Sequence, residues 1–190
     1  MSGRLYLFAA EMEQDAASPG GFTRNIAYGC CGIGLVDAAI GARTLIEKYQ
    51  PDEILFLGSC GAYPDKSLII GDIVMAASVR VGSGEITDGI VRVPSLQTSS
   101  FECVPLEGYA LPLVDVVCTL GVTEDDALSR SLSRLGDVEN LELFAICRAA
   151  GEIPVTAVLG VTNLVGAEGG LEWRRNYRRV MGLVGEVVGF

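Results

Sequence analysis

The chain has no histidine among its 190 residues. This absence excludes a Ser-His-Asp triad, a Cys-His pair, a zinc site with imidazole ligands and imidazole acid/base catalysis. Any catalysis must come from carboxylates, amides, hydroxyls, thiols or the backbone. Positive charge is also scarce, because 14 Lys and Arg stand against 24 Asp and Glu, for a net charge of −10. Nucleic acids and anionic membranes require clustered cationic side chains, so we expect neither as a partner, whereas small polar or anionic metabolites remain compatible with this charge.

Long hydrophobic runs and C-x-x-C spacings are absent as well. No apolar stretch approaches the roughly 18 to 20 residues of a membrane span, and the short apolar run at the N-terminus gives way to acidic residues, unlike a signal peptide. The full six-residue dinucleotide-binding fingerprint is missing too. We therefore expect a cytoplasmic protein without metal or cofactor. Its six cysteines are predicted to be buried, reduced thiols rather than a disulfide framework: Cys30, Cys31, Cys60, Cys103, Cys118 and Cys147.

What is present is an alternation of short Val-, Ile- and Leu-rich runs with helical patterns. This alternation is typical of an α/β fold, here a single domain over residues 1–190 whose mixed, largely parallel sheet is flanked by helices in a three-layer α/β/α arrangement. Residues 81–112 have little periodicity and are predicted to form loops and an edge hairpin. Strands are predicted at 4–9, 25–29, 53–57, 71–78, 115–120 and 155–161, and helices at 35–49, 143–150 and 173–187.

Polar or very small residues follow four of these strands, and ligands of open α/β sheets bind at the carboxyl ends of strands. Glu13 follows the first strand, where it could also be a solvated residue at a helix start. Cys31-Gly-Ile-Gly34 precedes a helix, and its amides could face an anion or a ribose, although Gly-x-Gly alone is common. Gly58-Ser-Cys-Gly-Ala-Tyr63 permits close approach to the backbone, or simply forms a tight turn.

The fourth group combines residues from two later segments. Glu142, at the head of a helix, is either a binding carboxylate or a cap of backbone amides. Asn163 ends the following strand, where an Asx turn is the alternative to a ligand contact. Trp173 begins the closing helix and could serve only in packing.

The order and spacing of these segments resemble the nucleoside phosphorylase and nucleosidase superfamily over nearly the whole chain. The resemblance rests on the run CGIGLVDAAIGARTLIEKYQPDEILFLGSCGAYPDKSLIIGDIVM and on the later ENLELFAI and VTNLVG. Within the superfamily, GAY after GSC, ITDG at 86–89 and TNLVGAEGGLEW resemble the futalosine hydrolase branch. Futalosine carries hypoxanthine as its base and belongs to an alternative menaquinone pathway.

The resemblance implies a role for three polar residues in breaking an N-glycosidic bond. Glu13 would be the general base acting on water. Glu142 would accept hydrogen bonds from the 2′ and 3′ hydroxyls of the ribose. Asn163 would stabilise the departing purine, because a carboxamide can donate to O6 or N7 of a 6-oxopurine, whereas a protonated Asp suits proton delivery to N7 of adenine.

Further residues would line the substrate pocket by the same resemblance, with Leu141 against the sugar. The implied partner is a small purine nucleoside, bound by a protein that is expected to be a homo-oligomer. The lining residues are Ser59, Cys60, Gly61, Leu141 and Trp173.

Three alternatives to a futalosine-type hydrolase stay open. A nucleoside phosphorylase would need an arginine-lined phosphate site, for which Arg43 and Arg80 could supply charge, although AAEMEQ stands where phosphorylases have Gly-Asp-Pro-x-x-Arg. An adenine-type methylthioadenosine/adenosylhomocysteine nucleosidase is the second. The third is a non-catalytic nucleoside-binding paralogue, favoured by the short stretch from Glu13 to Gly32 and by Leu159 where many relatives have Arg.

Overall fold

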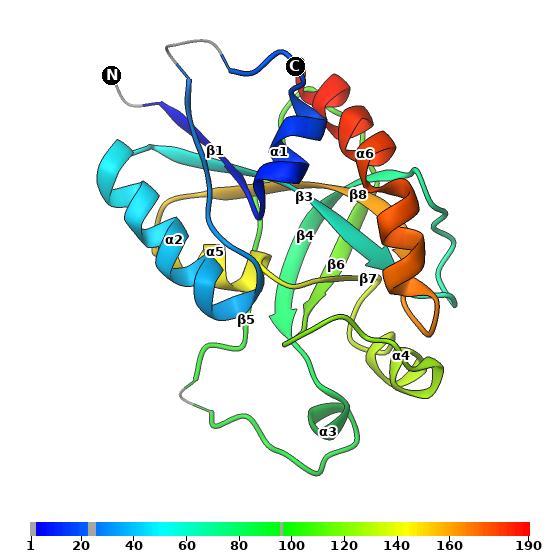
Figure 1. The fold of residues 1–190 in the computed structure, drawn as a ribbon. Helices are drawn as coiled ribbons and strands as arrows, with labels where there is room; N and C mark the ends of the chain where they lie inside the picture. The colour runs from blue at the N-terminus through cyan, green and yellow to red at the C-terminus, as the bar shows by residue number, and fades with distance from the viewer. Residues whose placement is uncertain (1–2, 23–25, 96) are drawn as a thin grey trace.

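The computed structural model describes residues 3–22, 26–95 and 97–190, and these form one eight-stranded sheet with helices on both sides (Figure 1). The strands are β1 (Arg4–Phe8), β2 (Ala27–Cys30), β3 (Glu53–Ala62), β4 (Ile73–Val81), β5 (Ser100–Glu102), β6 (Leu113–Cys118), β7 (Val138–Asn140) and β8 (Val155–Leu164). The helices are α1 (Glu11–Ala17), α2 (Gly34–Tyr49), α3 (Gly84–Thr87), α4 (Asp126–Leu132), α5 (Leu143–Ala150) and α6 (Gly169–Val188).

Strands β3 and β8 form the centre of the sheet. They run parallel and pair along nearly their whole length, and almost all of their residues are buried. Continuous apolar sequence such as ILFL in β3 and VLGV in β8 is what a strand covered on both faces requires. A register shift falls between Cys60 and Gly61, so that Cys60 pairs with Val161 and Gly61 pairs with Asn163.

The sheet also closes on itself around this centre. The end of β3 pairs antiparallel with β7, β7 pairs with β6, β6 with β4, and β4 antiparallel with β8, which pairs back with β3. Strands β1 and β2 extend the sheet beyond the first half of β3, and β5 lies outside β4. The carboxyl ends of β1, β3, β7 and β8 therefore lie close together at one edge of the sheet.

Two pairs of helices cover the sheet. Helices α1 and α6 pack against each other on one side, and α2 and α5 pack against each other on the other (Figure 1). The contact between α1 and α6 depends on Gly185, because a Cβ there would collide with the carbonyl of Ala17. No helix among residues 3–22, 26–95 and 97–190 is long and apolar enough to cross a membrane.

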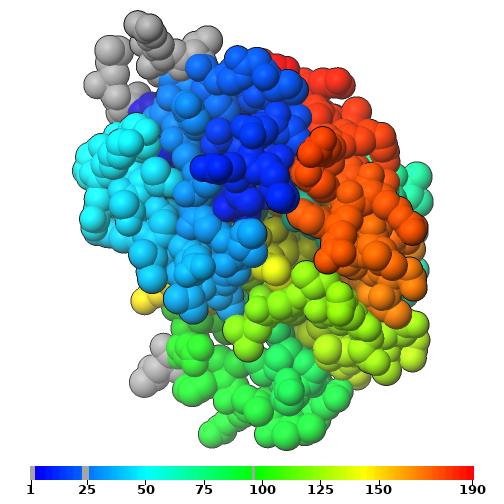
Figure 2. Space-filling view, viewed as in Figure 1, coloured from blue at the N-terminus to red at the C-terminus, as the bar shows by residue number. Residues whose placement is uncertain are grey.

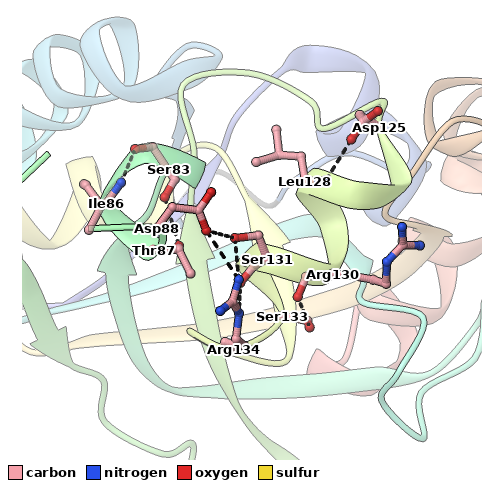
Figure 3. A network of polar contacts seen from close by, with 10 residues as sticks. All are labelled: Ser83, Ile86, Thr87, Asp88, Asp125, Leu128, Arg130, Ser131, Ser133 and Arg134. Carbon is pink, nitrogen blue, oxygen red and sulfur yellow. Dashed lines mark hydrogen bonds and ion pairs between the residues drawn. The ribbon is translucent and has the colours of Figure 1, made fainter. Parts of the chain in front are cut away.

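The segment after β4 leaves the sheet and docks on α4 (Figure 3). Asp88 accepts hydrogen bonds from the Ser131 hydroxyl at 3.1 Å and from the Arg134 guanidinium at 3.4 Å. Side chains cap α3 and α4: Ser83 accepts from an amide of α3, and Asp125 accepts from an amide of α4. These contacts fix the position of α4.

The α/β class and the largely parallel sheet are confirmed, with five parallel and three antiparallel pairings. All six predicted strands exist with shifted ends; for the strand predicted at 25–29, Asn25 lies outside the described residues. The edge hairpin predicted within 81–112 is not formed there: strand β5 of this segment pairs instead with residues 78–80 of β4. Helix α6 begins four residues before Trp173, and β7, α1, α3 and α4 were not predicted. Five of the six cysteines are buried, as predicted, whereas Cys30 is half-buried, and the described residues form no disulfide.

Candidate active site

A cavity of about 600 Å³, including its open mouth, lies where the ends of β1, β3, β7 and β8 meet. Figure 2 shows its opening between the blue α1, the light-blue start of α2 and the orange α6. The structure brings all eight predicted site residues to this one cavity, although they come from five segments of the chain. They are Glu13, Ser59, Cys60, Gly61, Leu141, Glu142, Asn163 and Trp173.

Glu13 projects from α1 into the cavity and is 5% exposed. Its Oε1 accepts two hydrogen bonds from Ser59, one from the hydroxyl at 2.5 Å and one from the amide at 3.2 Å. Its Oε2 is buried and accepts no hydrogen bond from the described residues. Burial raises the pKa of this carboxyl, and the two bonds from Ser59 oppose the rise. One carboxylate oxygen is thus fixed, and the other is available to a bound molecule.

The Ser59 hydroxyl joins Glu13 to the closing helix. It donates to Glu13 and accepts from the indole Nε1 of Trp173 at 3.0 Å. Trp173 also stacks on Tyr177, with ring centroids 4.8 Å apart. Trp173 therefore has a polar contact in the site as well as a packing role.

Glu142 lies at the N-cap of α5 and is held from two sides. Its Oε1 accepts from the Gly34 amide at 2.9 Å, and its Oε2 accepts from Nδ2 of Asn140 at 3.1 Å. Burial raises the pKa of Glu142 to about 7, and the nearby charge of Glu13 adds to the rise. The glycine-rich turn before α2, whose amides were expected to face an anion or a ribose, thus directs one amide at this carboxylate.

Asn163 and Gly61 lie side by side on the cavity floor. The register shift places Thr162 opposite no residue of β3, and a bulge of this kind redirects the neighbouring side chain. Nδ2 of Asn163 donates to the Leu164 carbonyl at 3.1 Å, and Thr162 Oγ1 donates to Oδ1 at 2.9 Å. A Cβ at Gly61 would lie 2.7 Å from Nδ2, so glycine is what leaves this floor open.

The comparisons with known proteins agree with this architecture. Residues 21–188 match the sequence profile of the phosphorylase superfamily. The chain belongs to this superfamily. A futalosine hydrolase mutant of Helicobacter pylori strain 26695 superposes on it with a TM-score of 0.85 and 12% identity, covering 99% of this chain and 97% of the other. A mutant 5′-methylthioadenosine/S-adenosylhomocysteine nucleosidase (MTAN) of the same species, with 5′-methylthioadenosine in its active site, superposes with a TM-score of 0.84 and 13% identity. The superposition covers 99% of this chain and 96% of the other.

Curated relatives of this superfamily member match it over shorter segments. A 5′-methylthioadenosine/S-adenosylhomocysteine nucleosidase of Shewanella baltica strain OS185 is 32% identical over 111 residues, or 58% of this chain and 40% of the relative. One from Maridesulfovibrio salexigens is 46% identical over 56 residues, or 30% of this chain and 24% of the relative. The chain thus matches less than half the length of either relative.

Two polar residues of the site, Glu139 and Asn140, were not among the predicted site residues. Glu139 of β7 lines the cavity and binds the segment after β6, with Oε1 2.9 Å from the Thr123 amide and Oε2 2.6 Å from the Thr123 hydroxyl. Burial raises the pKa of Glu139, and these bonds oppose the rise. Asn140 accepts from the amides of Glu142 and Leu143 and donates to the Ser59 carbonyl. Both residues lie in the short strand β7, which the sequence pattern did not predict.

The cavity wall is otherwise apolar and acidic. Its mouth is formed by Met12, Ile33 and Val122, and its charged residues are carboxylates, with no Lys or Arg among the described residues that line it. Arg43 and Arg80, the candidate phosphate ligands, do not line it. Within the described ranges, no three His, Cys, Asp or Glu side chains are grouped so that they could hold a metal ion.

Proposed function

We propose that this protein is a purine nucleosidase that hydrolyses the N-glycosidic bond of a 6-oxopurine nucleoside. The substrate we propose is futalosine, cleaved to hypoxanthine and dehypoxanthinyl futalosine in menaquinone biosynthesis. The observation that carries the proposal is that Oε2 of Glu13 is buried and has no partner among the described residues, in a cavity that also contains Glu142 and Asn163. Membership of the phosphorylase superfamily and the fold shared with a futalosine hydrolase support it.

Glu13 is proposed to remove a proton from the attacking water. A raised pKa makes a carboxylate a stronger base, and Oε2 has lone pairs available to a water molecule. The bonds from Ser59 to Oε1 hold the carboxylate in one orientation while it acts. General-base action of this kind contributes roughly 10²- to 10⁴-fold in rate.

Glu142 is proposed to hold the ribose. A carboxylate has about four acceptor positions, and the protein uses one on each oxygen, which leaves acceptors for the 2′ and 3′ hydroxyls. The sugar becomes oxocarbenium-like as the bond breaks, so a negative charge beside it stabilises the transition state more than the ground state. Leu141 lines the cavity next to Glu142 and would pack against the sugar.

Asn163 is proposed to bind the base. One N–H of its Nδ2 is used by the Leu164 carbonyl, and the other can donate to N7 or O6 of a 6-oxopurine. That bond strengthens as negative charge develops on the departing base. The open floor at Gly61 leaves room for a flat ring beside it.

Hydrolysis is favoured over phosphorolysis by the charge of the cavity. A phosphate nucleophile would enter a site lined by Glu13, Glu139 and Glu142 with no described cation to balance it. Water, which is neutral, meets no such repulsion. The names of the curated relatives make 5′-methylthioadenosine/S-adenosylhomocysteine nucleosidase the second candidate function.

A base-release assay tests the proposal. The protein is incubated with inosine, futalosine or 5′-methylthioadenosine, with and without phosphate, and free base is measured by chromatography. We expect hypoxanthine release that needs no phosphate, and a loss of at least about 100-fold in kcat for Glu13→Gln. Glu11→Gln, an exposed change on the same helix, is the matched control and should keep the rate. Strict dependence on phosphate, or a Glu13→Gln rate near that of the wild type, would contradict the mechanism.

We further propose that the protein works in the cytoplasm as a homo-oligomer. The exposed side chains of Ile33, Val36 and Ile40 follow one another along the start of α2, with 62%, 70% and 64% of their surfaces accessible. Such a row of apolar side chains is typical of an interface. Ile33 also lines the cavity, so a second copy on this face would lie near the substrate.

A further inference from the structure

The one tryptophan of the sequence, Trp173, donates a hydrogen bond inside the candidate active site. Its indole Nε1 is 3.0 Å from the Ser59 hydroxyl, and that hydroxyl donates to Oε1 of Glu13 at 2.5 Å. The three side chains come from α6, β3 and α1, and the two helices lie side by side over the sheet (Figure 1). Together they form a chain of hydrogen bonds that ends at the carboxylate.

The chemistry of the indole fixes the direction of this chain. An indole N–H donates a hydrogen bond and has no lone pair with which to accept one, whereas a serine hydroxyl can donate and accept. Because Trp173 can only donate to Ser59, the proton of that hydroxyl is left for Glu13. A bond accepted by a hydroxyl also polarises it, which strengthens the bond that it donates. Trp173 thus influences Glu13 although Ser59 lies between them.

The neighbours of Trp173 on α6 hold the indole in place. Glu172 accepts a hydrogen bond from the Leu164 amide at 2.8 Å, which joins the start of α6 to the end of β8. One turn further along the helix, the ring of Tyr177 stacks on the indole with an interplanar angle of 13°. The direction of the N–H toward Ser59 is therefore supported from both sides.

We propose that Trp173 is a positioning residue that acts on Glu13 through Ser59, keeping the Ser59 proton on Oε1 so that Oε2 is left for the attacking water. The inference rests on the proposed function, because it gives Trp173 this role only if Glu13 is the base. Glu13 must be charged before it can take a proton from water. Burial raises the pKa of Glu13, and the bonds from Ser59 oppose that rise by favouring the charged form. Trp173 supports this opposition.

Other titratable groups face Glu13 from the surrounding elements. Glu139 of β7 and Glu142 at the N-cap of α5 line the same cavity. Three thiols are coupled to the charge of Glu13: Cys30, Cys31 and Cys60. Burial raises the pKa of all three, so they stay neutral at and below neutral pH, and the indole of α6 does not titrate. Within the described residues, the partners of both carboxyls exclude Ser59 and Trp173, so a change at Trp173 removes no hydrogen bond from them.

NMR of protein labelled at the glutamate carboxyl carbons tests the proposal without a substrate. The resonance that disappears in Glu13→Gln belongs to Glu13, and its titration midpoint is followed with pH. In Trp173→Phe, which removes the indole N–H, we expect this midpoint to move to higher pH, because the bond that favours the charged carboxylate is weakened. Tyr177→Phe keeps the ring that stacks on the indole and is the matched control on the same helix. It should leave the midpoint of Glu13 unchanged.

An isosteric replacement separates the N–H from the ring. Because the chain has one tryptophan, expression with benzothienylalanine, in which sulfur replaces the N–H, changes Trp173 alone. This protein should shift the midpoint of Glu13 in the same direction as Trp173→Phe. In a Ser59→Ala background the connecting hydroxyl is gone, so Trp173→Phe should shift the midpoint no further. Equal shifts with and without the hydroxyl would show that Trp173 does not act through Ser59.

Base release then relates the shift to turnover. For Trp173→Phe we expect kcat/KM to fall by about 3- to 10-fold on the acidic side of the pH profile, as the loss of one hydrogen bond permits. The loss should become smaller as pH rises and Glu13 becomes charged in both proteins. A loss that is equal at every pH, or a Glu13 midpoint that stays in place, would overturn the role of Trp173. If the midpoint shifts but the wild type releases no base from any nucleoside, the hydrogen-bond link is correct and the proposed hydrolysis is wrong.

Discussion

At the scale of single residues, the candidate site is a chain of side chains that fix one another. The Ser59 hydroxyl links Glu13 to Trp173, and the Ser59 carbonyl accepts from Asn140, which in turn holds Glu142. Both carboxylates are thus oriented through one short stretch of β3. A buried carboxylate retained with its hydrogen-bond partners is costly to a fold, and it is found where chemistry requires it.

Asn163 is predicted to set the preference for the base. In Asn163→Asp, a carboxyl group able to protonate N7 should raise relative activity on adenine nucleosides and lower it on hypoxanthine nucleosides. A mispaired buried group costs roughly 1 to 3 kcal/mol, so we expect the ratio of kcat/KM for inosine to that for adenosine to fall by about 10- to 100-fold. Steady-state kinetics of both proteins on both substrates measure it. A wild type that prefers adenine would show that Asn163 does not read the base.

At the scale of helices and strands, long periodic segments were predictable and short ones were not. The face of α2 that contains Ala42 and Ile46 repeats at helical spacing, and both side chains are buried. Strand β7 has three residues, too few for any period to appear, so Glu139 and Asn140 were assigned no role although both stand in or directly beside the quoted run ENLELFAI. The bulge at Thr162 depends on pairing with β3, which a single sequence does not encode locally. Polar residues after predicted strands were enough to find the cavity, but not the contacts that fix them.

The exposed face of α2 is predicted to form a dimer interface. Val36→Asp and Ile40→Asp place a charge on this face, and burying an unpaired charge costs enough to prevent association. Light scattering should give the mass of a dimer or larger assembly for the wild type and about 20 kDa for the double variant. Ile69→Asp, at an exposed isoleucine outside α2, is the control and should leave the mass unchanged. A monomeric wild type would remove this face as an interface.

At the scale of the whole molecule, the closed ring of strands explains why three carboxylates share one cavity. The ring turns β7 back along the end of β3, which brings Glu139 beside Gly61 and the following Glu142 close to Glu13. All three are buried, and burial raises the pKa of each. Each therefore makes the folded state less stable, relative to the unfolded chain, once it must carry a charge.

This cost predicts how unfolding depends on pH. Glu142 has a pKa of about 7 in the folded protein, against roughly 4.3 in an unfolded chain, so between these values the folded state binds the proton more tightly. Its stabilising contribution to the unfolding free energy is fully present below the pKa of the unfolded chain, and it is lost as pH rises through the pKa of the folded protein. Glu142→Gln removes this dependence. Between pH 5 and pH 8 we expect the unfolding free energy of the variant to rise by on the order of 2 kcal/mol relative to that of the wild type, measured by urea unfolding at each pH. Glu107→Gln, at an exposed position, is the control and should show no such change. If the difference in unfolding free energy between Glu142→Gln and the wild type stays constant across this range, the pKa of Glu142 is not raised by burial in the folded protein.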